Sequence, residues 1–335
     1  MDSSLISPTV SVLMSVFNGE RWLSESIQSV LDQTFTDFEF IIVNDGSADG
    51  SLGIINQFAA EDPRIQVFDK PNTGLADSLN YGIARANGEW IARIDADDIC
   101  DRHRLLKQIS LARSNAHLVL IGSGLKLLDE NGIIGKTHTY PSDNNNLVRR
   151  LPCAKSFFPH SSAFFRTKTV KALGGYRTRI QRSQDRDLWL RLSEVGLLAS
   201  HPECLVFIRK HHSQISHQEN GRRQLIDSNV AMVSYWLRKL QSFDPVDATD
   251  PRAFDKFRFW VAEQLESGSV YQEARFVRDA KVRVQQSRSK IVRTYNLFMA
   301  PVLNPLGAFF WVLNKGRKCM PLRIAKKWIL YTSKS

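Results

Sequence analysis

Apolar and polar positions follow two different periods along the first hundred residues. Short runs rich in β-branched and aromatic residues predict four strands, over 10–16, 38–43, 65–68 and 90–94. Between these runs apolar residues recur at helical spacing, which predicts helices over 20–33, around 54–58 and after 74. Strands and helices that alternate at this pitch are typical of an α/β fold, with a parallel sheet and helices on both faces.

Polar side chains follow three of these strands at the point where each ends. Asn18 comes after the first strand, Asp45 after the second, and the acidic run 95–98 after the fourth. The carboxyl ends of parallel strands meet at one edge of a sheet, and ligands of open α/β sheets bind at that edge. The pattern therefore predicts a binding site built from these three turns.

Beyond residue 100 the pattern becomes mixed and then helical. Shorter apolar runs predict further strands, over 118–122, 124–128, 163–165 and 205–208. An amphipathic helix is indicated over 187–194, and helical spacing prevails from about residue 218 onward.

The positive charge is concentrated in the last fifth of the chain. The 335 residues are 43% hydrophobic and 24% charged, as in globular proteins. The formal net charge is +11, yet residues 270–335 hold fourteen Lys and Arg against two acids, so the remainder is almost neutral. A nucleic-acid-binding protein would spread its basic residues over a groove or patch. Nucleic acid is therefore not an expected partner.

The basic tail, residues 270–335, brackets an uncharged apolar segment at 294–314. This segment is close to the length of a membrane span, but its prolines and asparagines and the basic residues on both flanks argue against a span. We predict instead that the tail attaches to a membrane surface, with 321–331 as an interfacial helix. The alternative is a helical subdomain packed on the rest of the protein.

Two features of the sequence bear on location. The N-terminus lacks the basic start and apolar stretch of a secretory signal peptide. The four cysteines are far apart and form no C-x-x-C pair, which disfavours a disulfide framework or zinc ribbon and favours a reducing compartment. Together with the tail, these features predict a protein at the cytoplasmic face of a membrane.

The three carboxylates Asp95, Asp97 and Asp98 lie within four residues. Like charges so close together raise one another's pKa unless a cation neutralises them. Hard oxygen ligands suit Mg²⁺ or Mn²⁺. The alternative is a solvated acidic loop, or a cap for the helix after Asp101.

Four segments place the acidic run in a wider pattern. They read VSVLMSVFN at 10–18, VNDGS at 43–47, NTGLA at 72–76 and GEWIARIDADD at 88–98. Together they resemble the signature of glycosyltransferase family 2, over about residues 8–216. The resemblance implies the GT-A fold, a Rossmann-like mixed sheet with helices on both faces. It implies a catalytic domain over 1–216, with a nucleotide-binding half at 8–100 and an acceptor half at 101–216, followed by a helical region at 217–335.

The resemblance also implies a donor site in the first half. Asp45 would hydrogen-bond the base of a nucleotide sugar, typically uracil, and Asp95 would face the ribose or the metal. Asp97 and Asp98 would hold a divalent cation, Mn²⁺ or Mg²⁺, on the donor diphosphate. The nucleotide base would be lined by the end of the first strand, Ser15, Val16 and Phe17.

The second half of the implied site supplies the general base of the reaction. An inverting transfer needs a group that takes the proton of the acceptor hydroxyl. The family places an Asp after a Glu, just before a D-L-W-x-R helix, and here the segment reads QDRDLWLR from Gln184. Asp185 matches the base, Gln184 replaces the Glu, and Asp187 is a candidate for acceptor organisation or for a helix cap.

Three further elements resemble the family. In the segment RKHHSQIS, His211 would complete the metal shell, with His212 as the shifted alternative. His160, in a Pro-His element, would organise the acceptor site by packing or hydrogen bonding. Gly175, in a Gly-Gly-Tyr turn, would allow positive φ near the acceptor.

The resemblance predicts an inverting, metal-assisted glycosyltransferase that moves a sugar from a nucleotide donor, with a UDP-sugar favoured, to a lipid-linked or growing glycan. Cell-surface polysaccharide biosynthesis is the setting that the family implies. The alternative is a non-catalytic nucleotide-sugar or polysaccharide-binding protein on the same fold. A nucleotidyltransferase would need a basic, Gly-rich first loop, and residues 14–20 contain one glycine and no lysine.

Overall fold

The computed structural model describes residues 7–153, 157–211, 221–266 and 320–333. The chain divides into two compact units, Met1–Met232 and Val233–Ser335. The domain boundary expected after residue 216 lies outside the described residues.

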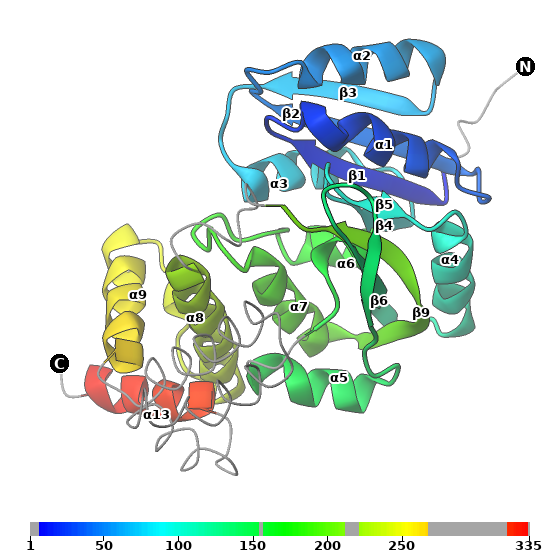
Figure 1. Cartoon of the computed structure of the whole chain (residues 1–335). Coiled ribbons are helices and arrows are strands. Elements are labelled where there is room, and N and C mark those ends of the chain that lie inside the picture. The colour runs from blue at the N-terminus through cyan, green and yellow to red at the C-terminus, as the bar shows by residue number, and fades with distance from the viewer. Residues whose placement is uncertain (1–6, 154–156, 212–220, 267–319, 334–335) are drawn as a thin grey trace, which may run out of the picture. The chain divides into compact units, whose positions relative to one another are not determined.

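The first unit is built on one mixed sheet (Figure 1). Its strands run in the order β3-β2-β1-β4-β8-β6-β9-β5, and β7 pairs with β6. The first four strands are parallel neighbours, as expected, whereas β8 runs antiparallel to both β4 and β6. The strands are β1 Val10–Val16, β2 Phe38–Asp45, β3 Ile65–Lys70, β4 Trp90–Arg93, β5 Ile99–Cys100, β6 Leu118–Leu128, β7 Ile134–His138, β8 Phe164–Arg166 and β9 Leu197–Arg209.

Helices follow the strands much as the apolar spacing predicts. In the first unit they are α1 Glu20–Leu31, α2 Ser51–Glu61, α3 Leu75–Arg85, α4 Arg104–Ser114, α5 Asn144–Arg150, α6 Thr167–Ala172 and α7 Gln184–Val195, with short 3₁₀ turns at Leu151–Cys153 (η1) and His160–Ser162 (η2). The helix α8, Arg222–Lys239, continues from the first unit into the second.

Alternate residues of the central strands pack on opposite faces of the sheet. Val12 and Met14 of β1 belong to an apolar core that also takes in Leu23 and Ile27 of α1. Leu13 points to the other face, where it lies against Gly82 of α3. Because both faces are covered, β1 and β2 are buried along almost their whole length rather than at alternate residues.

One strand prediction was wrong in its boundaries. Residues 118–122 and 124–128, expected as two strands, form the single strand β6. The register slips beside Ser123 and Gly124, so the pattern of side chains changes phase without ending the strand.

Among its described residues, the second unit contains the end of α8, the packed helices α9 (Pro251–Glu266) and α13 (Met320–Thr332), and a 3₁₀ turn at Pro245–Asp247 (η4). The Trp328 ring centroid lies 5.0 Å from the ring centroids of both Phe257 and Trp260. Ile324 and Ala325 of α13 are also buried. The apolar side chains that suggested an interfacial helix therefore pack within the protein, while the basic residues of α13 are exposed.

No helix in the described part of the chain is both long and apolar enough to span a membrane. The uncharged segment 294–314 lies outside the described residues.

The packing of β6 gives a test of the fold. A methyl group on Gly122 would meet ring atoms of the buried Phe158 at 2.1 Å, whereas one on Gly53 of α2 would meet nothing within 4 Å. Gly122→Ala is expected to lower the free energy of unfolding by about 1–3 kcal/mol, as overpacking does. The matched control Gly53→Ala should raise it by up to about 1 kcal/mol, since alanine favours the helix. Urea denaturation of both variants measures the difference, and equal stabilities would contradict this packing.

Candidate active site

The three clustered aspartates, of which Asp97 and Asp98 are the predicted metal ligands, lie in the turn between β4 and β5. One carboxylate oxygen from each of Asp95, Asp97 and Asp98 lies within 4.8 Å of the others. The apolar strand β4 ends directly before them, so the turn starts at the carboxyl edge of the sheet. Asp95 pairs with Arg93 of the preceding strand, whereas the contacts from Ser161, Arg209 and His211 come from distant parts of the sequence.

Asp95 is paired with a buried arginine of β4. Both terminal nitrogens of Arg93 bond its two oxygens, and the Ser161 hydroxyl donates to Oδ2 at 2.9 Å. The Arg93 residue is only 1% exposed. Burial acts to raise the pKa of Asp95, but the charge and hydrogen bonds of Arg93 outweigh burial and hold that pKa below its ordinary value.

Asp98 is buried and bonded on both oxygens. The backbone N–H of Arg209, at the end of β9, donates to Oδ1 at 3.0 Å. The Oδ2 atom lies within hydrogen-bonding distance of the Ser161 hydroxyl, whose single proton is shared between Asp95 and Asp98. Burial, followed by the charges of Asp97 and Asp95, raises the pKa of Asp98 well above its usual range. In this position Asp98 ties the acidic turn to η2 and to β9.

Asp97 is the more accessible of the two predicted metal carboxylates, with its side chain 30% exposed. The His211 Nε2 atom lies 2.8 Å from its Oδ2. The His211 ring in turn packs on Trp22 of α1, at 4.2 Å between ring centroids. Burial and the charge of Asp95 raise the pKa of Asp97. The alternative candidate His212 lies outside the described residues.

The donor atoms of this cluster fit a hard divalent cation. They are carboxylate oxygens with an imidazole beside them, the set that Mg²⁺ and Mn²⁺ accept. Arg93 pairs with Asp95, whereas burial, followed by the charges of neighbouring carboxylates, raises the pKa values of Asp97 and Asp98.

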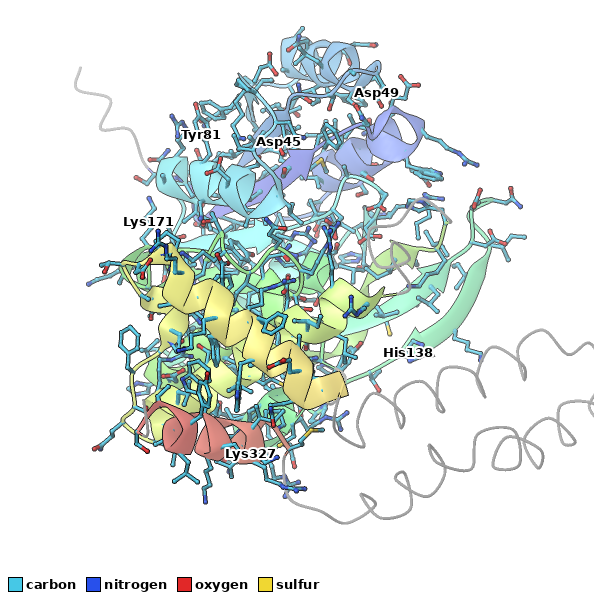
Figure 2. All side chains as sticks on the ribbon, turned by 90° about the vertical axis from the view of Figure 1, so that its left-hand side faces the viewer. Asp45, Asp49, Tyr81, His138, Lys171 and Lys327 are labelled. Carbon is cyan, nitrogen blue, oxygen red and sulfur yellow. The ribbon has the colours of Figure 1, made fainter. Side chains whose placement is uncertain are left out.

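Asp45 closes β2 and holds the loop before α3 (labelled in Figure 2). Its Oδ1 accepts from Lys70 Nζ at 2.6 Å and from the Thr73 N–H at 2.9 Å, and its Oδ2 accepts from the Gly74 N–H at 2.9 Å. Burial acts to raise the pKa of Asp45, but these donors outweigh burial and lower it. The carboxylate therefore stays ionised at the amino end of α3.

The other predicted donor residues surround the end of β1. Val16 is fully buried and Ser15 is partly buried, so neither presents a large surface. Phe17 is 55% exposed, which is unusual for a phenylalanine that follows a core strand. Asn18 has a φ of 52° and accepts a hydrogen bond from the Ala48 N–H at 2.8 Å, which joins the turn after β1 to the turn after β2.

Asp185 lies in the first turn of α7, and its Oδ1 accepts from the Arg186 N–H at 2.8 Å. Burial raises its pKa, against the opposing effects of Arg186 and Arg93, while the charge of Asp95 adds to the rise. Arg93 and Asp95 thus lie within electrostatic range of Asp185, so the structure brings the predicted base and the carboxylate cluster into one neighbourhood.

Asp187, two residues further on, sits between two arginines. Its oxygens accept from Arg177 Nε and from Arg191 Nε, each at 3.0 Å, and the residue is fully buried. Its place is thus structural, as a link between the start of α7 and the preceding turn. Gln184 is also buried, at 7% exposed.

His160 and Gly175 both adjoin Tyr176: His160 contacts its hydroxyl, and Gly175 precedes it in the chain. The His160 Nε2 atom is 2.7 Å from the Tyr176 hydroxyl, and Gly175 has a φ of 68°. Burial, followed by the charge of Arg93, holds the pKa of His160 well below its usual range, so the imidazole is neutral.

Several residues of the site were not predicted from the sequence. Arg93, Ser161 and Tyr176 occupy unspecified or neighbouring positions of the motifs. Ser161 and Tyr176 bond residues far away along the chain, whereas Arg93 bonds both the nearby Asp95 and the distant Ser161. An arginine inside an otherwise apolar strand, as in WIARI, is the one signal that could have identified Arg93, since a buried charge requires a partner.

Comparisons with known proteins agree with this arrangement. Residues 11–174 match the family described as Glycosyl transferase family 2. The O-antigen biosynthesis glycosyltransferase WbnJ of Escherichia coli is 32% identical over 207 residues, which are 61% of this chain and 80% of the relative.

Two solved structures share the fold. Residues 1–349 of S. aureus TarS, in complex with UDP, superpose with a TM-score of 0.55 at 14% identity, over 96% of this chain and 91% of that one. The mannosyltransferase PcManGT from Pyrobaculum calidifontis, in complex with GDP-Man and Mn²⁺, gives a TM-score of 0.54 at 16% identity, over 93% and 89%.

The predicted GT-A fold is thereby confirmed. From its sequence match and its similarity to a curated relative, the chain belongs to glycosyltransferase family 2 and is a glycosyltransferase enzyme.

Proposed function

We propose that this enzyme is an inverting, metal-assisted transferase that moves a sugar from a nucleotide-sugar donor to a lipid-linked or growing glycan. The observation that carries the proposal is the placement of Asp185. It is a carboxylate with a raised pKa, within electrostatic range of the Arg93–Asp95 pair that borders the carboxylate cluster. This placement supports a single site that combines a proton acceptor with a cation-binding group.

Asp185 acts as the general base. Burial makes its carboxylate more basic than a solvated aspartate, which brings its proton affinity closer to the task at neutral pH. It takes the proton from the acceptor hydroxyl as that oxygen attacks the anomeric carbon. Its first-turn position on α7, a helix packed against β6 and β9, keeps it fixed during this step.

The donor side is organised by the turns after β1, β2 and β4. Phe17 offers an exposed ring on which a base can stack, and Asp45 fixes the loop before α3. Asp97, with Asp98 and His211, would hold the cation, and a bound Mn²⁺ or Mg²⁺ would offset the charge of the departing diphosphate. TarS with UDP, and PcManGT with GDP-Man and Mn²⁺, support a nucleotide diphosphate and a metal here, and the sequence pattern favours a UDP-sugar.

The setting that we propose is cell-surface polysaccharide biosynthesis, supported by the name of WbnJ. The enzyme would act at the cytoplasmic face of a membrane, where a lipid-linked acceptor is found. The exposed basic residues of α13 support attachment to that surface.

Removing the carboxylates of Asp97 and Asp185 tests the roles that we propose for them. Asp97→Ala and Asp185→Asn are each expected to lower kcat for nucleotide release by at least about 100-fold. Asp185→Asn removes the general base, which contributes that much, and Asp97→Ala removes a ligand of the cation that would stabilise the departing diphosphate. The measurement is a donor screen with UDP- and GDP-sugars and Mn²⁺, with membranes as the source of acceptor.

Asp143→Asn is the matched control, because Asp143 caps α5 away from the carboxylate cluster and asparagine caps a helix equally well. Variants that stay folded and turn over donor as fast as the wild type would refute the assigned roles. Donor binding without turnover by the wild type would favour the non-catalytic alternative.

The raised pKa of Asp185 predicts the acid side of the pH–rate profile. The base works only when deprotonated, so kcat/KM falls as the pH drops through the pKa of Asp185. Because burial raises that pKa, the fall should begin above the value of about 4 that an exposed aspartate would give. An acid limb at or below pH about 4, measured at saturating Mn²⁺, would contradict this environment for Asp185.

Attachment to an anionic surface is tested on α13, whose basic residues Arg323, Lys326 and Lys327 are exposed. Their joint replacement by glutamine should weaken binding to phosphatidylglycerol vesicles on the order of 100-fold, at about 1 kcal/mol for each charge. Deletion of α13 would be a poorer test, because it uncovers Phe257 and Trp260.

The control removes the same charge from exposed residues of the first unit, Arg113, Lys136 and Lys168. Equal vesicle binding by the two triple variants in a sedimentation assay would refute the role of α13.

A further inference from the structure

We propose that Asn80, on helix α3 of the donor half, is a positioning residue that sets the acceptor side of the active site through the Gly174–Tyr176 turn. This inference rests on the proposed function. Asn80 is a positioning residue rather than a catalytic one, because its side chain bonds the backbone of the turn.

Asn80 binds the turn through its backbone. Its side-chain oxygen accepts from the Tyr176 N–H at 2.7 Å, and its side-chain nitrogen donates to the Tyr176 carbonyl at 2.8 Å. Gly175 makes this approach possible, because a Cβ at that position would lie 2.3 Å from the Asn80 oxygen. The amide of asparagine supplies one acceptor and one donor, which is the pair that a backbone N–H and C=O require.

The same turn is held from the opposite side by α7. Arg191 donates to the Gly175 carbonyl at 2.6 Å and to the Leu173 carbonyl at 2.9 Å. Arg191 also bonds Asp187, in the first turn of α7 beside Asp185. The turn therefore links α3 to the helix that carries the predicted base.

The side chain of Tyr176 extends this link to the second acceptor element. Its hydroxyl lies 2.7 Å from His160 Nε2, and the His160 ring packs edge-on against Trp189 of α7 at 5.6 Å between centroids. Tyr176 is 2% exposed, so its ring has one position once its backbone is fixed. A shift of the turn would move the hydroxyl and the histidine together.

The other end of α3 faces the donor site. Asp45 bonds the N–H groups of Thr73 and Gly74, directly before the helix begins at Leu75. One rigid helix of eleven residues thus has the Asp45 carboxylate at its start and the acceptor turn at its side. Asn80 is the side chain through which the donor-half helix holds the acceptor half.

The experiment compares Asn80→Ala, Tyr176→Phe, the double variant and the control Asn144→Ala. Asn144 makes a similar bond from a helix to a backbone N–H, that of Leu198, at 2.9 Å. UDP affinity in the presence of Mn²⁺ is measured by calorimetry, and kcat and KM by nucleotide release with membranes as acceptor source. Asn80→Asp, which keeps only the acceptor half of the pair, tests for partial rescue.

We expect Asn80→Ala to lower kcat by about 10- to 100-fold, as small misplacements of catalytic groups do, with UDP affinity changed less than threefold. Tyr176→Phe should lower kcat as well, and the double variant should lose less than the product of the two single losses, since both act through one turn. Asn80→Asp should fall between wild type and Asn80→Ala.

Three results would overturn the inference: an Asn80→Ala enzyme with kcat within twofold of wild type, losses that multiply in the double variant, or a fall in kcat matched by the Asn144→Ala control. A wild-type enzyme that releases nucleotide from no donor would instead refute the proposed function, and the inference with it.

Discussion

Three carboxylates share the turn after β4, and the arrangement of the catalytic unit follows from the need to hold them there. Their oxygens lie within 4.8 Å of one another in a partly buried site. Repulsion and desolvation would protonate or disperse them without compensation. Arg93 neutralises Asp95, the His211 ring contacts Asp97, and Ser161 and the Arg209 N–H bond Asp98.

These compensating groups explain why the sheet is mixed. The first four strands would build the donor edge alone, but the partners of the carboxylates come from η2, which precedes β8, and from the end of β9. The strand β8 pairs antiparallel with β4, and this pairing places Ser161 beside the acidic turn. The acceptor half is thus joined to the donor half through hydrogen bonds to the same three aspartates.

Hydrogen bonds also fix the residues around the predicted general base, Asp185. Asp187 and its two arginines fix the start of α7, and Asn80 with Arg191 fixes the turn beside it. Asp185 itself bonds the adjacent Arg186 N–H and has a raised pKa, as a proton acceptor requires. The two neighbouring carboxylates thus have different surroundings: two arginines hold Asp187, whereas burial raises the pKa of Asp185.

The parts of this structure that depend on local pattern could be predicted from the sequence. The strands at 10–16 and 90–94 follow from apolar runs, and the acidic turn follows from the strand that precedes it. Contacts between distant residues could not be predicted. Asn80 and Tyr176 are 96 positions apart, and Asp98 and Arg209 are 111 apart, so no period or spacing connects them. The continuity of strand β6 was also not predicted, because its register against β9 slips beside Ser123 and Gly124, which interrupts the apolar pattern without ending the strand.

The central claim is that the carboxylate cluster binds a divalent cation that carries the donor diphosphate. Calorimetric titration of the full chain with UDP, with Mn²⁺ and after metal removal by a chelator, tests this claim most directly. We predict saturable binding of UDP in the presence of Mn²⁺, and an affinity for UDP lower by at least about tenfold after the metal is removed. Equal affinity in the two conditions would contradict it.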